Sequence, residues 1–404
     1  MLVGFMKNFK EPDYMAKLLA MTCKFQGIDL IYFRPKDINM LNKTVSGKMF
    51  INNTWTTVET KLPPFIDIAA YCFKKENREI IKYLRKNTFL SDDRTNRLSK
   101  KALQEKLLED ERFSSLVIPT IKEQGLGSID DFLTKHSVIV MKPIGGEAGK
   151  GVYILKKERN HYVLGYKIRE KFLTSSEFEQ FYMENIRYEK YILQKHISSR
   201  TIHGDPFDCR VHVEKNGKGE WANARTFIRI GVGQKVISNV NFGGGRSDLN
   251  PFLKTNFKDN WKQIEQRLHE LATTLPYKIE QLRATHIMTL GFDVGIEQNG
   301  QLYLFEANSN PGTDPLKAEV AMLRAEYYKY VLMHGANQEL LKLKNIQKIN
   351  DQLMDNIKNE QYEKNMYRQK YKLIKNSRTW KATAPVRKAS KLTKQLLKKE
   401  NLKM

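Results

Sequence analysis

The sequence predicts an α/β fold, built from α+β lobes, that ends in a basic helical tail. Its first residues alternate an apolar strand at 2–6, an amphipathic helix near 12–25 and a second strand at 30–33. Two further strands flank Asn299-Gly300, a residue pair that favours a tight hairpin turn. The chain has 404 residues, which is long enough for two or three folded units with a sizeable core.

An apolar strand is expected at 138–143, with Lys142 near its end, and a glycine-rich segment follows at 145–151. Glycines let the backbone N–H groups approach phosphate oxygens closely. The spacing is neither a Walker A motif nor a Rossmann fingerprint, because a strand rather than a helix follows at 152–155. A glycine hairpin without a ligand, and a solvated lysine at the strand end, remain open alternatives.

The C-terminal hairpin carries a group of oxygen ligands. Asp293 lies in its first strand, and Glu306 and Asn308 lie two residues apart in the second strand, so their side chains share a face. Two carboxylates and an amide suit Mg²⁺, which prefers oxygen ligands. The alternative is an ordinary surface hairpin with acidic residues. Helical apolar spacing at 261–274 and 318–334 predicts amphipathic helices on either side of this hairpin.

These motifs, taken in chain order, resemble the ATP-grasp superfamily: a lysine closing a strand, a glycine-rich hairpin, and a later Asp followed by Glu-x-Asn. The chain is also similar to the YheC/YheD-type ATP-grasp proteins, a group described as associated with endospore coats. That similarity extends over roughly residues 1–335. It is carried by residues 45–48, the region of Trp55, and residues 62–64, 191–197, 206–213, 229–231, 238–240 and 243–245.

The resemblance implies two parts, a pre-ATP-grasp α/β domain at 1–90 and an ATP-grasp domain at 91–335. A basic helical or coiled-coil tail is expected separately at 336–404, from its charge and apolar spacing, and lies outside the resemblance. The two lobes of the ATP-grasp domain are expected at about 91–190 and 191–335. ATP would lie between these lobes under the glycine hairpin as a mobile lid, and the first domain would help to shape the acceptor site.

The resemblance also assigns nucleotide-binding residues. Lys142 would contact the α-phosphate and adenine side, together with Lys101 at the start of a helix, for which Lys100 is the alternative. Residues 194–197 would meet the adenine edge, although Gln194 also reads as an ordinary strand residue. The expected nucleotide-binding residues are Lys101, Lys142, Gly145, Gly146, Glu147, Gly149, Lys150, Gly151, Gln194, Lys195, Ile197 and Asp208.

Catalytic and metal residues follow from the same resemblance. Asp208-Cys209-Arg210 is similar to the family's Asp-x-Arg, whose arginine would bind the transferred phosphoryl group. Arg229 resembles a second such arginine, with Arg225 on the same strand face as a substitute, and solvated strand arginines are the alternative. Asn239 would lie near the metal. The expected metal ligands are Asp293, Glu306 and Asn308, which would hold one or two Mg²⁺ ions, with Mn²⁺ as a further option.

The resemblance implies an ADP-forming carboxylate–amine ligase. A carboxylate cannot lose oxide to an amine directly, so such enzymes first form an acyl phosphate from ATP. The expected role is synthesis or modification of a bacterial cell-envelope polymer, with carboxylate and amine substrates that the sequence does not identify. The alternative is a non-catalytic ATP-binding scaffold in envelope or spore-coat assembly. A specific nucleic-acid binder is disfavoured, because the chain has no helix-turn-helix, zinc-finger or RNP pattern.

The cysteines and the apolar segments predict a cytoplasmic protein. Cys23, Cys72 and Cys209 form no CxxC pair or zinc pattern, which favours reduced thiols. Cys209 is expected to be a buried spacer, with a redox switch as the alternative. No apolar stretch reaches transmembrane length, and the N-terminus has no secretory apolar region.

The tail concentrates positive charge. The chain carries a net charge of +24, and residues 336–404 contribute eighteen Lys or Arg against six Asp or Glu. Apolar residues in heptad spacing predict a long helix there, and a coiled coil remains open. The segment 376–388 resembles a C-terminal segment of surface-polysaccharide enzymes. We expect contact with anionic membrane or with envelope-synthesis enzymes. A disordered basic tail is the alternative, and homo-oligomerisation is left open.

Overall fold

The computed structural model describes residues 1–144, 151–166, 169–231, 244–334, 362–370 and 375–376. The chain divides into two compact units, 1–340 and 341–404. Within the described residues, unit 1 contains three β-sheets and the helices that cover them, so the predicted α/β class is confirmed. The further division of unit 1 into a first domain and two lobes stays a prediction.

The first sheet is formed by the N-terminal residues and has the order β3-β4-β2-β1-β6-β7, with β5 paired to β4. Strand β1 pairs in parallel with β2 and with β6, so the predicted strand–helix–strand start is confirmed. The strands are β1 (Leu2–Met6), β2 (Asp29–Phe33), β3 (Ile38–Asn39), β4 (Thr44–Ile51), β5 (Thr54–Lys61), β6 (Phe65–Ile68) and β7 (Phe89–Leu90).

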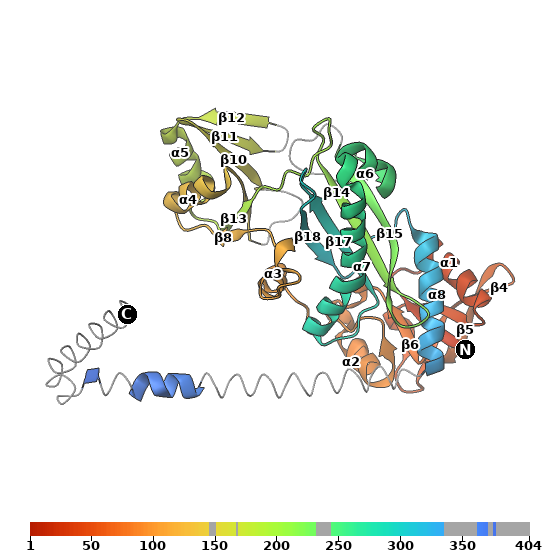
Figure 1. Cartoon of the computed structure of the whole chain (residues 1–404). Helices are drawn as coiled ribbons and strands as arrows, with labels where there is room; N and C mark the ends of the chain where they lie inside the picture. The colour runs from red at the N-terminus through yellow and green to blue at the C-terminus, as the bar shows by residue number, and fades with distance from the viewer. Residues whose placement is uncertain (145–150, 167–168, 232–243, 335–361, 371–374, 377–404) are drawn as a thin grey trace, which may run out of the picture. The chain divides into compact units, whose positions relative to one another are not determined.

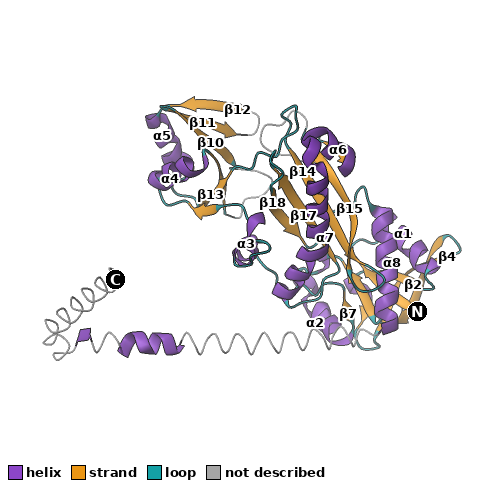
Figure 2. Cartoon of the chain, viewed as in Figure 1, coloured by secondary structure: helices purple, strands orange, loops and turns teal. Residues whose placement is uncertain are grey.

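The second sheet has the order β12-β11-β10-β9-β13-β8 and carries the predicted lysine strand, β9. Apolar side chains of α4 (Leu126–His136) and α5 (Ser175–Asn185) pack against it, and Figure 2 shows both helices beside its strands. The strands are β8 (Thr120–Lys122), β9 (Val138–Pro143), β10 (Tyr153–Glu158), β11 (His161–Tyr166), β12 (Arg169–Leu173) and β13 (Tyr191–Lys195).

The third sheet is antiparallel, with the order β16-β15-β14-β17-β18. The predicted hairpin around Asn299-Gly300 is confirmed as β17–β18, and Gly300 has the positive φ (+83°) that such a turn requires. The strands are β14 (Phe207–Lys215), β15 (Trp221–Ile230), β16 (Gly245–Asp248), β17 (Thr289–Ile296) and β18 (Leu302–Asn308).

One long helix, α7 (Trp261–Arg283), lies along one face of the third sheet (Figure 1). Its buried residues Ile264, Leu268, Leu271, Leu275 and Ile279 recur at helical spacing and pack on Val211, Ile228 and Phe292 of the sheet. Because alternate residues of a strand face opposite sides, this apolar face directs the polar residues of β14 to the other side.

The helices predicted near 12–25 and at 318–334 are observed as α1 (Tyr14–Phe25) and α8 (Lys317–His334), with nearly the same bounds, whereas α7 continues to Arg283, beyond the predicted 261–274. None of the described helices combines the length and the apolar character needed to cross a membrane. In the tail, residues 362–370 are helical, whereas the remaining predicted heptad and the segment 377–404 lie outside the described residues. The other helices are α2 (Arg78–Asn87), α3 (Lys100–Leu108) and α6 (Leu249–Phe257).

Candidate functional site

Two arginine–carboxylate pairs lie side by side across the central strands of the third sheet. Arg210 on β14 is the register partner of Asp293 on β17, and its Nε and Nη2 lie 2.5 and 3.1 Å from the two carboxylate oxygens. Arg229 on β15 is the partner of Asp208 on β14, at 2.6 and 2.8 Å. Arg229 also reaches Asp293 at 3.1 Å, so the four side chains form one cluster.

The charges in this cluster are mutually stabilised. Burial opposes the charged form of Arg229, but the hydrogen bond and charge of Asp208, together with the charge of Asp293, raise the pKa of Arg229 above its ordinary value. Only 12% of the side-chain surface of Arg210 and of Asp293 is exposed. The cluster therefore holds two guanidinium cations against two carboxylates on one sheet face.

The hairpin adds the remaining expected metal ligands. Glu306 on β18 is the register partner of Asp293, and Asn308 follows two residues later on the same strand. The Lys100 ammonium lies 2.8 Å from the Glu306 carboxylate, whose side chain remains one-third exposed. No group of three or more His, Cys, Asp or Glu suited to a metal occurs in the described ranges, and the expected set contains only two carboxylates.

These residues fit a hard divalent cation by the chemistry of their donors. Asp293, Glu306 and Asn308 offer oxygen atoms alone, which Mg²⁺ prefers, and no sulfur or imidazole intervenes. In the structure, arginine and lysine side chains hold the two carboxylates. A cation at this position would compete with those contacts, or the basic side chains would turn to an anionic ligand beside it.

The second sheet supplies a half-buried lysine, Lys142. Lys142 on β9 donates to the Gln194 Oε1 on β13 at 2.7 Å, and the Gln194 amide donates to the Thr120 hydroxyl on β8 at 2.9 Å. Burial, followed by the nearby Lys100 charge, lowers the pKa of Lys142, while Glu306 opposes this shift. An anion placed beside Lys142 and Lys100 would relieve their mutual repulsion.

The segment 194–197 contacts both sheets. Lys195 donates to the Tyr303 hydroxyl at 2.9 Å and reaches Glu297 at 3.2 Å, both at the β17–β18 hairpin. Although burial opposes it, these two partners raise the pKa of Lys195. Ile197 is buried. Lys195 therefore joins the second sheet to the third in addition to any contact with a nucleotide.

Lys100 and Lys101, the two candidates for the nucleotide-binding lysine on α3, differ in their contacts. Lys100 reaches Glu306, whereas Lys101 pairs with Glu105 one turn along α3, so the structure brings Lys100 to the cluster. The preference for Lys101 as the nucleotide contact has no support in these contacts.

Arg225 shows the same kind of contrast with Arg229. It pairs with Asp248 at 2.9 Å and with Glu319 at 3.3 Å, outside the cluster, so Arg229 rather than Arg225 joins the site.

Several predicted residues cannot be placed. Gly145, Gly146, Glu147, Gly149, Lys150 and Asn239 lie outside the described residues. Gly151 is described, with φ of +72°, and its carbonyl accepts a hydrogen bond from the Tyr191 hydroxyl at 3.1 Å. Cys209 is buried and free, as predicted for a spacer, and its burial raises the pKa of its thiol.

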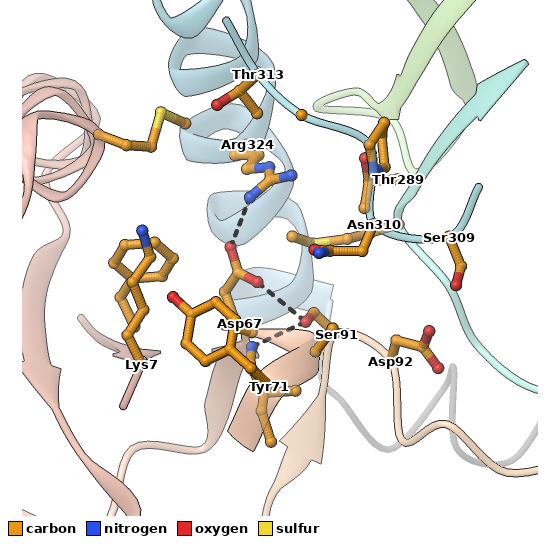
Figure 3. A pocket seen from close by; sticks show the side chains of 18 of the residues that line it. Lys7, Asp67, Tyr71, Ser91, Asp92, Thr289, Ser309, Asn310, Thr313 and Arg324 are labelled. Carbon is orange, nitrogen blue, oxygen red and sulfur yellow. Dashed lines mark hydrogen bonds and ion pairs between the residues drawn. The ribbon is translucent and has the colours of Figure 1, made fainter. Parts of the chain in front are cut away.

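The sequence reading missed a cavity of about 330 Å³, which is lined in part by the segment that follows β18 (Figure 3). It lies between the carboxyl ends of β1 and β6, the segment 309–314 that follows β18, and α8. The side chains of Ser309, Asn310 and Thr313 line it without a hydrogen bond to any described residue. The only signal in the sequence was the Asn-Pro-Gly that follows Asn308.

A buried ion-pair network closes one wall of the cavity. Arg324 on α8 bridges Asp67 on β6, at 3.1 Å, and Glu214 on β14, at 3.0 Å. Asp67 also accepts hydrogen bonds from the Ser91 and Tyr328 hydroxyls, and Figure 3 shows Asp67 between Arg324 and Ser91. A single arginine in an amphipathic helix carries no sequence signal of such a bridge.

Residues 93–335 match the model of a protein family described as YheC/D-like ATP-grasp. Two curated relatives come from Bacillus subtilis (strain 168). The endospore coat-associated protein YheC is 23% identical over 329 residues, covering 77% of this chain and 88% of YheC. The endospore coat-associated protein YheD is 23% identical over 325 residues, covering 77% of this chain and 70% of YheD.

Solved structures with similar folds include the C-terminal domain of K. lactis Pby1, an ATP-grasp enzyme that interacts with the mRNA decapping enzyme Dcp2. It has a TM-score of 0.48 and 13% identity, and the match covers 82% of this chain and 92% of that one. The ATP-grasp ligase PsnB, complexed with precursor peptide PsnA2 and AMPPNP, has a TM-score of 0.47 and 10% identity, covering 81% of this chain and 98% of PsnB.

Proposed function

Because this chain belongs to the YheC/D-like ATP-grasp family, we propose that it is an ATP- and Mg²⁺-dependent carboxylate–amine ligase that forms ADP. One observation carries the proposal. Arg210, Arg229, Asp208 and Asp293 meet on the third sheet, with Glu306 on the next strand. Lys100 contacts Glu306 directly, and the charges of Lys100 and Glu306 act on Lys142 of the second sheet. A scaffold that only binds ATP has no need of the complete set.

The proposed reaction has two displacements. A carboxylate oxygen of the acceptor attacks the γ-phosphorus of ATP, the bond to the β-phosphate oxygen breaks, and ADP leaves. An amine then attacks the acyl carbon of the resulting acyl phosphate, phosphate leaves with the electron pair, and the nitrogen loses a proton. Bound Mg²⁺ would supply charge neutralisation for the phosphoryl oxygens, with Asp293, Glu306 and Asn308 as its proposed ligands.

The protein's own groups would mainly position the substrates and neutralise the negative charge of the transferring phosphoryl group. Arg210 and Arg229, held in a partly buried cluster, would bind the transferring phosphoryl group and the acyl phosphate. Lys142, whose charge is only partly offset by Glu306, would take the phosphate side of the nucleotide. Residues 194–197 would meet the adenine edge. The cavity beside segment 309–314 is the proposed acceptor site, because this segment follows directly after Asn308, a proposed metal ligand at the end of β18.

The second candidate is an ATP-binding scaffold without turnover. It is favoured by the names of the two curated relatives, which refer to association with the endospore coat. A role in making or modifying a cell-envelope polymer, a cytoplasmic location and a homo-oligomeric state stay predictions. Contact of the basic tail with an anionic membrane or with envelope enzymes also stays a prediction.

Nucleotide product analysis by mass spectrometry tests the proposal. Purified protein is incubated with ATP, Mg²⁺, amino acids and a low-molecular-weight extract of envelope precursors. ADP and phosphate that appear only with extract, together with a new mass equal to two components minus water, would support the ligase. Bound but unchanged ATP across all extracts would favour the scaffold. AMP with pyrophosphate would contradict the acyl-phosphate route.

A further inference from the structure

Four basic side chains line the cavity beside segment 309–314, and three of them have acidic partners. The positive charge of each of these three side chains is neutralised, since each lies against at least one carboxylate. The paired cations are Lys7 with Asp13 at 2.6 Å, Lys317 with Asp314, and Arg324 with Asp67 at 3.1 Å and Glu214 at 3.0 Å.

Arg94 is the fourth cation, and its guanidinium forms no hydrogen bond or ion pair with any described residue. Its guanidinium carbon lies 5.8 Å from the centre of the Phe73 ring, which also lines the cavity. The nearby Asp92 carboxylate is committed elsewhere: it lies 2.8 Å from Arg283 and accepts from the Arg94 backbone N–H at 2.7 Å.

The surroundings of Arg94 disfavour the charged form of its guanidinium. Burial, then the neighbouring Arg97 charge and the Arg283 charge, lower the pKa of Arg94, and only Asp92 opposes this. A half-buried cation of this kind gains most from an anionic ligand, because the ligand restores the charge balance that the protein leaves incomplete.

The backbone at Arg94 is also held in an uncommon conformation. Its φ is +58°, a left-handed value that favours Gly, Asn and Asp over arginine. Asp92 accepts the Arg94 N–H, and Asp93 accepts the Thr95 N–H at 2.8 Å and the Thr95 hydroxyl at 2.7 Å, which fixes the turn. Strain of this kind that the surroundings enforce is frequent at ligand sites.

The anion at Arg94 would be separate from the reacting carboxylate. Arg210, Asp293 and Glu306 do not line the cavity, and the reacting carboxylate has to lie beside them to meet the phosphoryl group. One carboxylate cannot lie both beside Arg210 and against Arg94. An anionic group of the acceptor that binds Arg94 is therefore a second group of the same substrate. The guanidinium fork suits either a carboxylate or a phosphate.

We propose that the acceptor substrate carries a second anionic group, a carboxylate or a phosphate, and that Arg94 binds it. This proposal rests on the proposed ligase function, because that function places the reacting carboxylate beside Arg210, Asp293 and Glu306. It narrows the acceptor to acids with two anionic groups and makes Arg94 a specificity-determining residue.

Modification of the full-length protein by phenylglyoxal, an arginine reagent, gives a readout at Arg94 itself. The rate at which Arg94 is modified is followed by peptide mass spectrometry, with three probes: glutarate, 3-phosphonopropionate and the neutral glutaramide. We expect both anionic probes to slow modification of Arg94 several-fold and the neutral probe to leave it unchanged. Exposed Arg97, which does not line the cavity, is the internal control.

The comparison of the probes also distinguishes the two anions. Stronger protection by 3-phosphonopropionate than by glutarate would assign a phosphate-bearing acceptor, and the reverse order a dicarboxylate. Equal modification rates with all three probes would overturn the proposal. Protection by glutaramide as strong as that by glutarate would also overturn it, because shape rather than charge would then explain the effect.

A matched pair of variants gives a second test. Arg94→Asn removes the charge but keeps a residue that tolerates the left-handed backbone, and Arg97→Asn makes the same change outside the cavity. Calorimetric affinity for glutarate or 3-phosphonopropionate should fall about tenfold or more in the first variant. It should stay within about twofold in the second. Unchanged affinity in Arg94→Asn would overturn the proposal.

Failure of this proposal is distinguishable from failure of the ligase function. ADP formation with a monoanionic acid that Arg94→Asn leaves unchanged would contradict the second anionic group and keep the ligase. No ADP formation with any acid, while the anionic probes still protect Arg94, would contradict the ligase and support an anion site.

Discussion

Arg210 donates two hydrogen bonds to Asp293 across neighbouring strands, from Nε at 2.5 Å and from Nη2 at 3.1 Å. The sequence assigns these two side chains to different tasks, phosphoryl binding and metal binding. Their pairing is fixed by the register of β14 against β17, so the two tasks share one position in the sheet. In this structure the arginine neutralises the carboxylate that a cation would otherwise hold.

Neutralising either carboxylate of the proposed metal ligands should strongly reduce turnover. Asp293→Asn or Glu306→Gln removes one negative charge from the proposed metal ligands, and we expect ADP formation to fall by about 100-fold or more. Glu306→Gln is the cleaner variant, because its side chain is one-third exposed and its loss should hardly affect the unfolding midpoint. Glu105→Gln, an exposed carboxylate on α3, is the control. Normal turnover in either site variant would mean that the metal assignment is wrong.

Lys100 and Lys101 can be separated by their affinity for ATP. Lys100→Ala should weaken ATP binding about tenfold or more, because Lys100 lies against Glu306 and acts on Lys142, whereas Lys101→Ala should change it less than about twofold. Titration of a fluorescent ATP analogue at constant Mg²⁺ measures both. A larger loss in Lys101→Ala would support the sequence-based preference for Lys101 and count against Lys100.

Arg324 should be essential for stability. Arg324→Met leaves Asp67 and Glu214 buried without their shared cation, which should cost about 3–5 kcal/mol in the free energy of unfolding. Denaturant unfolding followed by circular dichroism measures the loss. The control is Arg112→Met, which breaks an exposed pair with Glu270 and should change stability by less than about 0.5 kcal/mol. Equal losses in the two variants would show that the bridge contributes nothing specific.

Glu280 should make stability depend on pH in acid. Despite burial, the ring of His286, whose Nδ1 lies 3.7 Å away, and the charge of Lys215, at 2.9 Å, lower the pKa of Glu280 to about 2, against 4.5 for a free glutamate. A depressed pKa in the folded state contributes stability above the unfolded value, and this contribution is lost as pH falls from about 4.5 toward about 2. The loss should amount to roughly 3 kcal/mol. Unfolding free energies across this range should be flatter in Glu280→Gln, and an unchanged slope would contradict the assignment.

The basic tail should bind anionic lipid. Removal of residues 376–404 deletes a lysine-rich segment with scattered apolar residues, so cosedimentation with vesicles of anionic phospholipid should decrease. Turnover of a soluble substrate should be unaffected. Full-length protein with neutral vesicles is the control for charge. Equal sedimentation of truncated and full-length protein with anionic vesicles would exclude a membrane role for the tail.

The sequence by itself determined the family and the strands that carry the expected metal ligands. The predicted membership in the YheC/D-like ATP-grasp family is confirmed by the match over residues 93–335. Strand alternation placed Glu306 and Asn308 on one face, and the Asn-Gly turn paired them with the strand of Asp293, because both signals are local. The lysine strand and the strand–helix–strand start were local in the same way.

Only the tertiary structure decided which residues meet across long separations in the chain. Lys100 rather than Lys101 reaches Glu306, and Arg229 rather than Arg225 joins Asp293, because sheet register and helix rotation select one side chain from each pair. The cavity and its cation Arg94 come from segments on different elements of the fold. Periodicity and local motifs carry no information about such contacts, since packing between distant elements fixes them.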